Sequence, residues 1–209
     1  MNDRFSVAER VYETLRDDIK LGVYKAGERI DISSAAMRLH TSISPVRAAL
    51  NRLSGERLVE SHPHEGFSVP HLSEVGLREQ FEWSYRLALL ALRWPTEAAG
   101  KPDDFKEILN VADTVLAIEA LIIGIGELTP NLDLRKELAI SNVRLHRVRR
   151  IEVGLFPDLN REIRRWQETW LKGDREGVAQ AFDTQHDRRR SFVPQIIERL
   201  HQTPSRSTR

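Results

Sequence analysis

Apolar residues recur with helical spacing through the stretch 41–53. They follow the i, i+3, i+4, i+7 order of one buried helix face, at Val46, Ala49, Leu50 and Leu53. Ser44 directly precedes Pro45, and a hydroxyl residue at the N-cap followed by proline at the first helical position is a strong helix start. The pattern therefore predicts a helix that begins after Ser44.

The other face of this helix has a different character. It carries Arg47, Ala48, Asn51 and Arg52. In a DNA major groove, arginine can bond guanine bidentately and asparagine can bond adenine. Taken alone, the stretch fits a DNA recognition helix and a plain surface helix equally well.

Two further helical patterns precede this stretch. The first, residues 6–21, is expected to end near Leu21 because Gly22 follows. Its apolar residues stand four apart, at Val7, Val11, Leu15 and Ile19. The second covers about 33–39, and a short turn joins it to the helix of 41–53. Two helices joined by a turn of this length are typical of a helix-turn-helix.

Two short strand-like runs follow Gly55. They are residues 58–61 and 67–69, and the turn between them, 62–66, contains proline and glycine. This order predicts a β-hairpin. Three helices followed by such a hairpin make a winged helix.

Strand-like alternation disappears beyond residue 73. Amphipathic helical patterns take its place, and their ranges are 77–92, 105–122, 134–153, 166–170 and 178–200. In the last range we expect Pro194 to kink the helix. We therefore predict a mainly α protein with a winged helix-turn-helix over 1–70, a linker over 71–76, an all-helical domain over 77–201 and a disordered tail over 202–209.

The charge of the whole chain says little about its binding partners, but the charge of one segment is informative. The chain has 209 residues and a net charge of +1, so its overall charge does not indicate binding to a polyanion. Residues 38–57, however, hold four arginines against one glutamate, a local net charge of +3. A local patch is enough to attract phosphate.

The sequence also bears on compartment and cysteine chemistry. It contains no cysteine, which excludes a disulfide framework and a cysteine-based zinc site. We see no signal-peptide pattern, and the longest apolar run, 120–125, is too short to span a bilayer. We therefore expect a cytoplasmic protein with no membrane partner.

The span from about 7 to 70 resembles the DNA-binding domain of the GntR family of bacterial transcription regulators. The matching segments are VYETLRDDIKLGVYKAGERI, LHTSISPVRAALNRL, ERLVES and HEGFSV. Four separated signals fall in the family's order, which makes the resemblance specific. Two positions depart from it: Ala26 stands where proline is usual, and Ile43 where a base-reading arginine is usual.

The resemblance implies a double-stranded DNA operator with an inverted repeat, bound by a homodimer that acts as a repressor. The implied DNA-binding residues are Ser33, Ser42, Ile43, Ser44, Arg47, Asn51, Arg52, His64 and Gly66. At the wing, His62 and His64 could bind a metal, but a wing tip that touches phosphate or the minor groove is the stronger expectation, and for His62 a plain exposed turn is stronger still.

Residues 73–200 resemble the helical ligand-sensing FCD domain of FadR-type members of that family. The similarity rests on helical content, on Glu82-Trp83-Ser84-Tyr85-Arg86, on Asn142-Val143-Arg144-Leu145-His146, and on Lys172-Gly173-Asp174 with the later His186. Leu90 departs from the glutamate common at that place. The resemblance implies dimerisation and a small-molecule effector, such as a carboxylate. The candidate effector-binding residues are Trp83, Arg86, Asn142, Arg144, His146 and His186.

The same resemblance raises the question of a divalent metal such as zinc, nickel or manganese. Asn142 and His146 share one helix face, and His186 lies on a later helix, so the three are the candidate metal ligands. The family set is three histidines and an aspartate. Here an asparagine replaces the aspartate, and the position of the missing histidine falls near Ile163 or Arg164. We therefore expect no tightly bound metal at full occupancy.

Three functions stay open at this point. The leading hypothesis is a ligand-responsive transcription regulator that is not an enzyme. The helical domain could instead be a metal-dependent enzyme, although the sequence contains no HExxH motif or Gly-rich phosphate loop. A third alternative is a DNA-binding dimer whose helical domain has lost its ligand and only assembles. The arginines near the candidate effector site fit either an anion-binding site or a solvated face.

Overall fold

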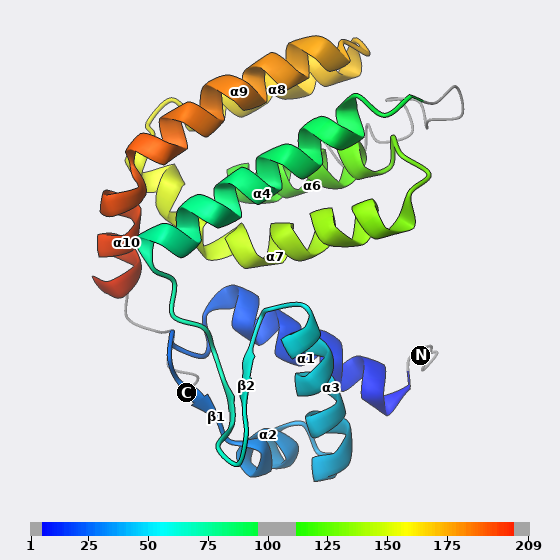
Figure 1. The fold of residues 1–209 in the computed structure, drawn as a ribbon, viewed down its shortest axis with the longest axis vertical. Coiled ribbons are helices and arrows are strands. Elements are labelled where there is room, and N and C mark those ends of the chain that lie inside the picture. Colours follow the sequence, from blue (N-terminus) through cyan, green and yellow to red (C-terminus); the bar gives the residue numbers. More distant parts are fainter. Residues whose placement is uncertain (1–5, 96–111, 203–209) are drawn as a thin grey trace. The chain divides into compact units, whose positions relative to one another are not determined.

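The computed structural model describes residues 6–95 and 112–202 of the chain. These residues fall into two compact units, one ending at Leu72 and the other spanning Ser73–Gln202. The first is a winged helix-turn-helix and the second is a helical bundle (Figure 1). The predicted mainly α fold class is confirmed.

Within residues 6–72, the part of it that the structure describes, the first unit contains three helices and a small sheet. Its elements are α1 (Val7–Leu21), β1 (Arg29–Ile30), α2 (Ile32–Arg38), α3 (Ile43–Gly55), β2 (Glu60–His62) and β3 (Gly66–Ser68). The sheet has the order β1-β3-β2 and is antiparallel, with Ile30 and Ser61 both opposite Phe67. The sequence pattern predicted the hairpin of β2 and β3 but not the short strand β1.

Helix α3 is the helix predicted from 41–53, but it begins two residues earlier than predicted. Its N-cap is Ser42, not Ser44, and the Ser42 side chain makes no capping hydrogen bond. Pro45 is therefore the third helical residue. Proline is tolerated there because the N–H groups of the first turn have no intrahelical partner.

The second unit is built from six described helices. They are α4 (Glu74–Leu92), α6 (Thr114–Gly126), α7 (Leu132–Leu155), α8 (Leu159–Leu171), α9 (Arg175–Ser191) and α10 (Val193–Gln202). Helix α4 packs against α7 and α9, α6 packs against α7, and α8 packs against α9 (Figure 1). Their inward residues form one apolar core that includes the fully buried Trp170.

Several helix boundaries differ from the predicted ones. Helix α4 begins at Glu74, inside the stretch 71–76 predicted as a linker, because the Ser73 side chain accepts a hydrogen bond from the Gly76 amide at 3.1 Å. Helix α6 begins at Thr114, where Asp113 caps it. The part of the predicted 105–122 helix before residue 112 lies outside the described residues, as does 203–209 of the predicted tail. Gln202, predicted as the first tail residue, is instead the last residue of α10.

The predicted kink at Pro194 is wrong, because α9 and α10 are separate helices. Phe192 ends α9, and Pro194 lies in the first turn of α10. Proline cannot donate a hydrogen bond to the carbonyl of Arg190, four residues earlier. Arg78 of α4 donates to that carbonyl instead, at 2.8 Å. The break is thus stabilised by a contact between helices distant in sequence.

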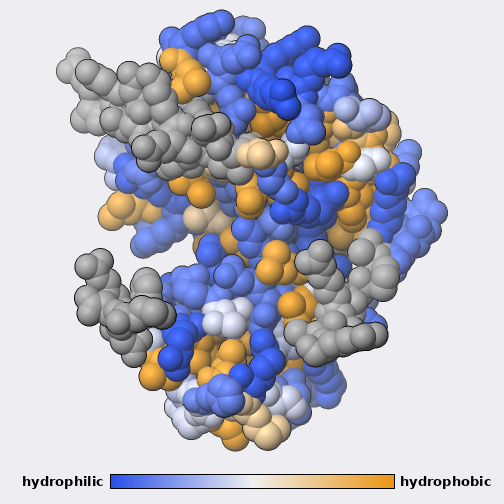
Figure 2. Space-filling model, turned by 180° about the vertical axis from the view of Figure 1, so that it is seen from behind, coloured by the Kyte–Doolittle hydropathy of each residue, from blue (hydrophilic) through white to orange (hydrophobic). Residues whose placement is uncertain are grey.

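Apolar side chains also reach the surface of the second unit. They include Trp83 and Leu90 on α4 and Leu116 and Ile123 on α6. On the face shown in Figure 2, apolar patches are interspersed with hydrophilic ones. Among the described residues, no helix combines the length and apolar character needed to cross a membrane.

Candidate nucleic-acid interface and bundle interior

The outward face of α3 is fixed by what the helix buries. Its four inward residues are at most 4% exposed, and they are Val46, Ala49, Leu50 and Leu53. They pack mainly against α1, which leaves Arg47, Ala48 and Asn51 exposed on the other side. Ile43 is 47% exposed at the first turn. An arginine, an amide and an apolar side chain thus lie together on one solvent-facing helix surface.

Arg52 has a different environment from Arg47. Its guanidinium lies 3.5 Å from the centre of the Tyr12 ring, and its Nη1 donates to Glu9 Oε2 at 2.9 Å. The Tyr12 hydroxyl in turn donates to Glu56 Oε1 at 2.7 Å. Arg52 therefore joins α3 to α1, and this internal role limits its availability to a DNA base.

Arg38 is likewise engaged inside its own unit. It pairs with Asp18 and donates to the Tyr24 hydroxyl at 3.3 Å. The local net charge of +3 counted for residues 38–57 left out Asp18 and Glu9, because both belong to α1. The basic character of the face is therefore weaker than the count suggested, and it rests chiefly on Arg47.

The wing and the start of α2 present the remaining candidate DNA-binding residues. At the hairpin turn, His64 and Gly66 both have positive φ angles, of 62° and 89°. His64 is exposed, and Ser33 lies beside the Asp31 cap of α2 without being buried. These residues, like Ser42 and Ser44 at the start of α3, are not buried, so they are accessible for contact with DNA.

The candidate effector-binding residues divide between the surface and the interior of the bundle. Arg86 is exposed and paired with Glu82 at 2.7 Å, and the exposed Trp83 donates to Glu137 at 3.3 Å. Arg144 is only partly exposed. Arg147 is also partly buried, and burial lowers its pKa.

The three candidate metal ligands are all buried, but they belong to two sets of contacts. Asn142 and His146 both contact Glu119 of α6. His186 Nε2 instead lies 2.9 Å from Glu82 Oε2, and its ring stacks on Tyr85. Burial lowers the pKa of His186, although Glu82 opposes this. Among the described residues, no group of three or more histidine or acidic side chains is arranged to hold a metal.

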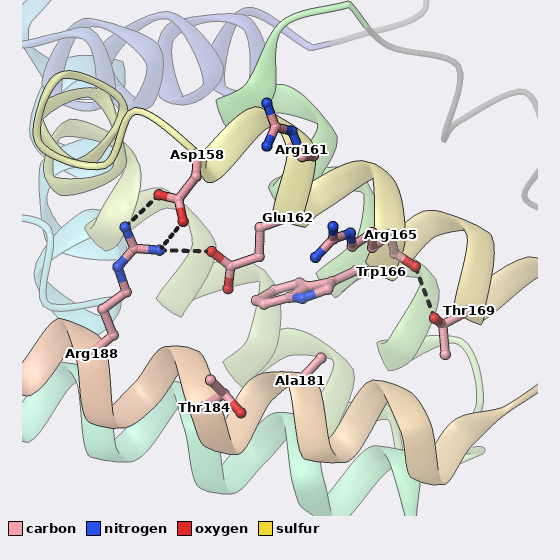
Figure 3. Close-up of a pocket in the computed structure, with 9 residues that line it drawn as sticks. All are labelled: Asp158, Arg161, Glu162, Arg165, Trp166, Thr169, Ala181, Thr184 and Arg188. Atoms are coloured by element: carbon pink, nitrogen blue, oxygen red, sulfur yellow. Dashed lines mark hydrogen bonds and ion pairs between the residues drawn. The ribbon is translucent and has the colours of Figure 1, made fainter.

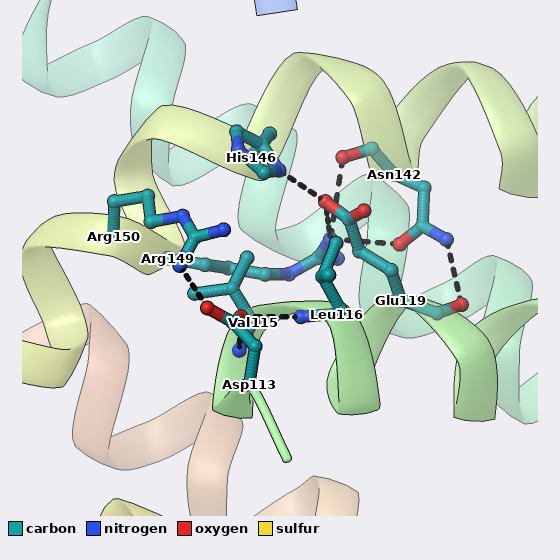
Figure 4. A network of polar contacts seen from close by, with 8 residues as sticks. All are labelled: Asp113, Val115, Leu116, Glu119, Asn142, His146, Arg149 and Arg150. Carbon is teal, nitrogen blue, oxygen red and sulfur yellow. Dashed lines mark hydrogen bonds and ion pairs between the residues drawn. The ribbon is translucent and has the colours of Figure 1, made fainter. Parts of the chain in front are cut away.

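A buried polar network fills the interior around Asn142 (Figure 4). His146 Nδ1 lies 2.7 Å from Glu119 Oε1, and the Asn142 amide donates to the Glu119 backbone carbonyl at 2.9 Å. Arg149 Nη1 donates to Asn142 Oδ1 at 2.7 Å. Burial, with the nearby charge of Arg189, lowers the pKa of Arg149 to about 10.

The sequence analysis missed Glu119 and Arg149. Both carried a signal: Glu119 is a lone charge in the apolar run of α6, and Arg149 follows Asn142 by seven residues, so the two share a helix face. The network continues to Glu152, which accepts from Arg189 Nη2 at 2.8 Å.

Several buried atoms of this interior have no hydrogen-bond partner among the described residues. They are Arg149 Nε and Nη2, Arg189 Nε, Gln185 Nε2 and Glu152 Oε1. Gln185 and Arg189 also line a small cavity of about 10 Å³, close to the space of one water. Donors outnumber acceptors in this set, so it suits a ligand that supplies anionic oxygen.

A larger, open pocket of about 450 Å³ lies between α8 and α9 (Figure 3). Its lining includes Trp166 and a charged cluster in which Arg188 bonds both Asp158 and Glu162. The hydrogen bond from Arg188 lowers the pKa of Asp158, whereas burial raises that of Glu162. These ion pairs link α8 to α9.

Comparisons with known proteins agree with this arrangement. Residues 7–69 match the family described as "Bacterial regulatory proteins, gntR family". Over 108 residues the chain is 31% identical to the HTH-type transcriptional regulator McbR of Escherichia coli K12. That match covers 52% of this chain and 48% of McbR, so it spans about half of the curated relative.

Solved structures extend the likeness in fold to most of the chain. A GntR transcriptional regulator from Rhodococcus sp. RHA1 has a TM-score of 0.72 at 20% identity, covering 90% of this chain and 98% of its own. The structure of E. coli McbR/YncC has a TM-score of 0.65 at 19% identity, covering 91% and 98%. At these identities the likeness concerns the fold alone.

Proposed function

We propose that this chain, whose N-terminal domain belongs to the gntR family of bacterial regulatory proteins, is a transcription regulator that responds to a small molecule. The observation that carries the proposal is the outward face of α3, where Arg47 and Asn51 are exposed while the opposite face is buried. A helix of this kind, after a helix and a turn, is the element that enters the DNA major groove.

Each exposed residue of the α3 face has a chemical role in this proposal. Arg47 bonds guanine and Asn51 bonds adenine, whereas Ile43 presses against a thymine methyl group. Ser33, Ser42 and Ser44 bond backbone phosphates. Arg52 positions α3 on α1 and does not read a base.

The wing and the homodimer provide the remaining contacts of the proposed complex with DNA. His64 and Gly66 of the wing approach the DNA backbone, and a homodimer places two copies of α3 on an inverted repeat. The proposed regulator acts as a repressor in the cytoplasm and needs no membrane partner. Because the related regulators suggest DNA binding and not turnover, we propose that the chain is not an enzyme.

We place the effector in the interior of the bundle. The buried donors of Arg149, Arg189 and Gln185 have no partner among the described residues, and an anionic group such as a carboxylate would supply the missing acceptors. The small cavity requires that the helices move to admit such a molecule, and that movement is the proposed link to DNA binding. Asn142, His146 and His186 border this interior.

Selection from random DNA tests the proposed DNA binding. Tag-free full-length protein is incubated with a pool of random duplexes, and the bound fraction is sequenced over several rounds. We expect enrichment of an inverted repeat. A bound pool with the same base composition at every position as the starting pool would contradict sequence-specific binding.

A second measurement tests the effector. Small carboxylates are screened for their effect on the melting temperature of the protein, and each one that binds is added to the complex with the selected DNA. We expect one of them to change the DNA affinity. Carboxylates that bind without changing DNA affinity, or none that bind, would favour the alternative in which the helical domain only assembles.

A further inference from the structure

The side chain of Arg149 is fully buried in the helical bundle. It extends from α7 toward Glu119 on α6 and Asn142 on its own helix (Figure 4). A buried guanidinium is costly unless carboxylates and hydrogen-bond acceptors surround it. The neighbouring side chains must therefore supply the acceptors that stabilise this buried guanidinium.

Every side chain that would bind a metal around Asn142 already has another partner. Asn142 Oδ1 accepts from Arg149 Nη1 at 2.7 Å, and Asn142 Nδ2 donates to the Glu119 carbonyl at 2.9 Å. His146 Nδ1 lies 2.7 Å from Glu119 Oε1. Arg149 Nη1 lies 3.6 Å from that same carboxylate oxygen. One guanidinium thus contacts the amide and the carboxylate that a metal would require.

A divalent cation at this place would meet a charge of its own sign at short range. The guanidinium of Arg149 carries this charge, because arginine stays protonated in proteins. Two cations in a dry interior repel each other strongly. Asn142 also offers a neutral amide oxygen, which binds a metal more weakly than the aspartate carboxylate that the resemblance to the FCD domain implies at this position. The residues present therefore do not fit a bound metal.

We infer that Arg149 is a resident cation that takes the place of a metal ion at the centre of this bundle. Its guanidinium compensates the charge of Glu119 and holds Asn142, so the bundle needs no metal to assemble. Two of its nitrogens, Nε and Nη2, have no partner among the described residues and stay available to an anion. The inference does not depend on DNA binding.

The test compares zinc binding by tag-free full-length variants. Asn142→Asp restores the carboxylate but keeps Arg149, and Asn142→Asp with Arg149→Ala removes the resident charge as well. Asn142→Asp with Arg149→Lys keeps a positive charge, and Asn142→Asp with Arg150→Ala removes the exposed neighbouring arginine. Zinc content after dialysis and zinc titration calorimetry are measured for each, and His146→Ala in the same background assigns any zinc to this site.

We expect no zinc that depends on His146 in any protein that keeps a cation at position 149. These proteins are the wild type, the single variant Asn142→Asp, and the double variants that add Arg149→Lys or Arg150→Ala. The double variant that adds Arg149→Ala should bind about one equivalent, because the Glu119 carboxylate, the new carboxylate at position 142 and His146 then face an open position.

Two results would overturn the inference. One is zinc that depends on His146 in the wild type or in Asn142→Asp alone, because the guanidinium would then coexist with the metal. The other is a folded double variant with Arg149→Ala that binds no zinc. If that double variant does not fold, Asn142→Asp with Arg149→Met takes its place, because methionine removes the charge but still fills the buried space. The same result is expected, and a folded protein of this kind without zinc would overturn the inference.

Discussion

At the scale of single residues, the proposed base recognition depends most on Arg47. We predict that Arg47→Ala weakens binding to the selected DNA by about 1–3 kcal/mol and relaxes preference at one base pair. Arg47→Lys is the matched control, because it keeps the charge but loses the bidentate geometry. Binding of a panel of single-base variants by fluorescence anisotropy measures both effects. An unchanged affinity in Arg47→Ala would contradict the assignment of α3.

Ile43 leads to a second prediction at this scale. Isoleucine cannot donate a hydrogen bond to guanine, so the half-site should prefer A·T at the base pair it faces. Ile43→Arg should shift that preference to guanine and raise affinity for all DNA, because it adds a positive charge. Repeating the selection with the variant checks the first effect and its salt dependence checks the second. Identical base preferences for parent and variant at every position would refute the prediction.

Some properties of single residues could be predicted from the sequence, and others could not. The exposure of Arg47 and Asn51 follows from helical periodicity and was predicted correctly. The engagement of Arg52 could not be predicted, because its partner Glu9 lies 43 residues earlier in the chain. Such a pair exists only once α1 and α3 are packed.

At the scale of elements, Tyr12 connects α1 to α3 through Glu56 and Arg52. Burial and the hydrogen bond to Glu56 raise the pKa of Tyr12, so the folded state favours the protonated phenol. The resulting stabilisation is complete below pH of about 10, the usual tyrosine pKa, and is lost as the pH rises through the folded-state pKa.

We therefore predict two effects of Tyr12→Phe. At neutral pH it should lower the free energy of unfolding by about 1 kcal/mol, because Glu56 loses its hydrogen-bond donor. Above pH of about 10 the wild type should lose stability more steeply than the variant, since only the wild type can ionise at this position. Urea unfolding across this pH range measures both, and parallel curves would show that the contact does not stabilise the fold.

Helix existence and helix boundaries were not equally predictable. The apolar patterns located α1, α3, α4 and α7, because each helix buries one regular face. The separation of α9 from α10 was missed, because the carbonyl freed by Pro194 is bonded by Arg78 on α4. A kink and a break look alike in sequence until that partner is known.

At the scale of the whole molecule, the order of a winged helix and a helical domain followed from the sequence, and the interior of the bundle did not. Glu119 lies within an apolar run and Arg149 within a charged one. Only the packing of α6 on α7 brings them to 3.6 Å. The candidate metal ligands indicated the right face of α7, and the lone charge of Glu119 was a signal in the sequence, but the contact between the two helices could not be predicted.

This network gives a prediction for the stability of the helical domain. Glu119→Ala should lower the free energy of unfolding by about 3–5 kcal/mol, because it removes the carboxylate that pairs with the buried guanidinium of Arg149. Glu168→Ala, at an exposed position of α8, is the matched control and should change stability by less than about 0.5 kcal/mol. Chemical denaturation compares the two. Equal effects of both substitutions would show that the Glu119 carboxylate does not stabilise the interior.

Above all, we propose that the chain recognises a specific DNA sequence. The most direct test compares the affinity of the tag-free full-length protein for its selected duplex and for a shuffled duplex of the same composition, at about 0.15 M salt. We predict a preference of at least about 10³-fold for the selected duplex. Equal affinities that fall together as salt rises would contradict sequence-specific recognition and leave only attraction to phosphate.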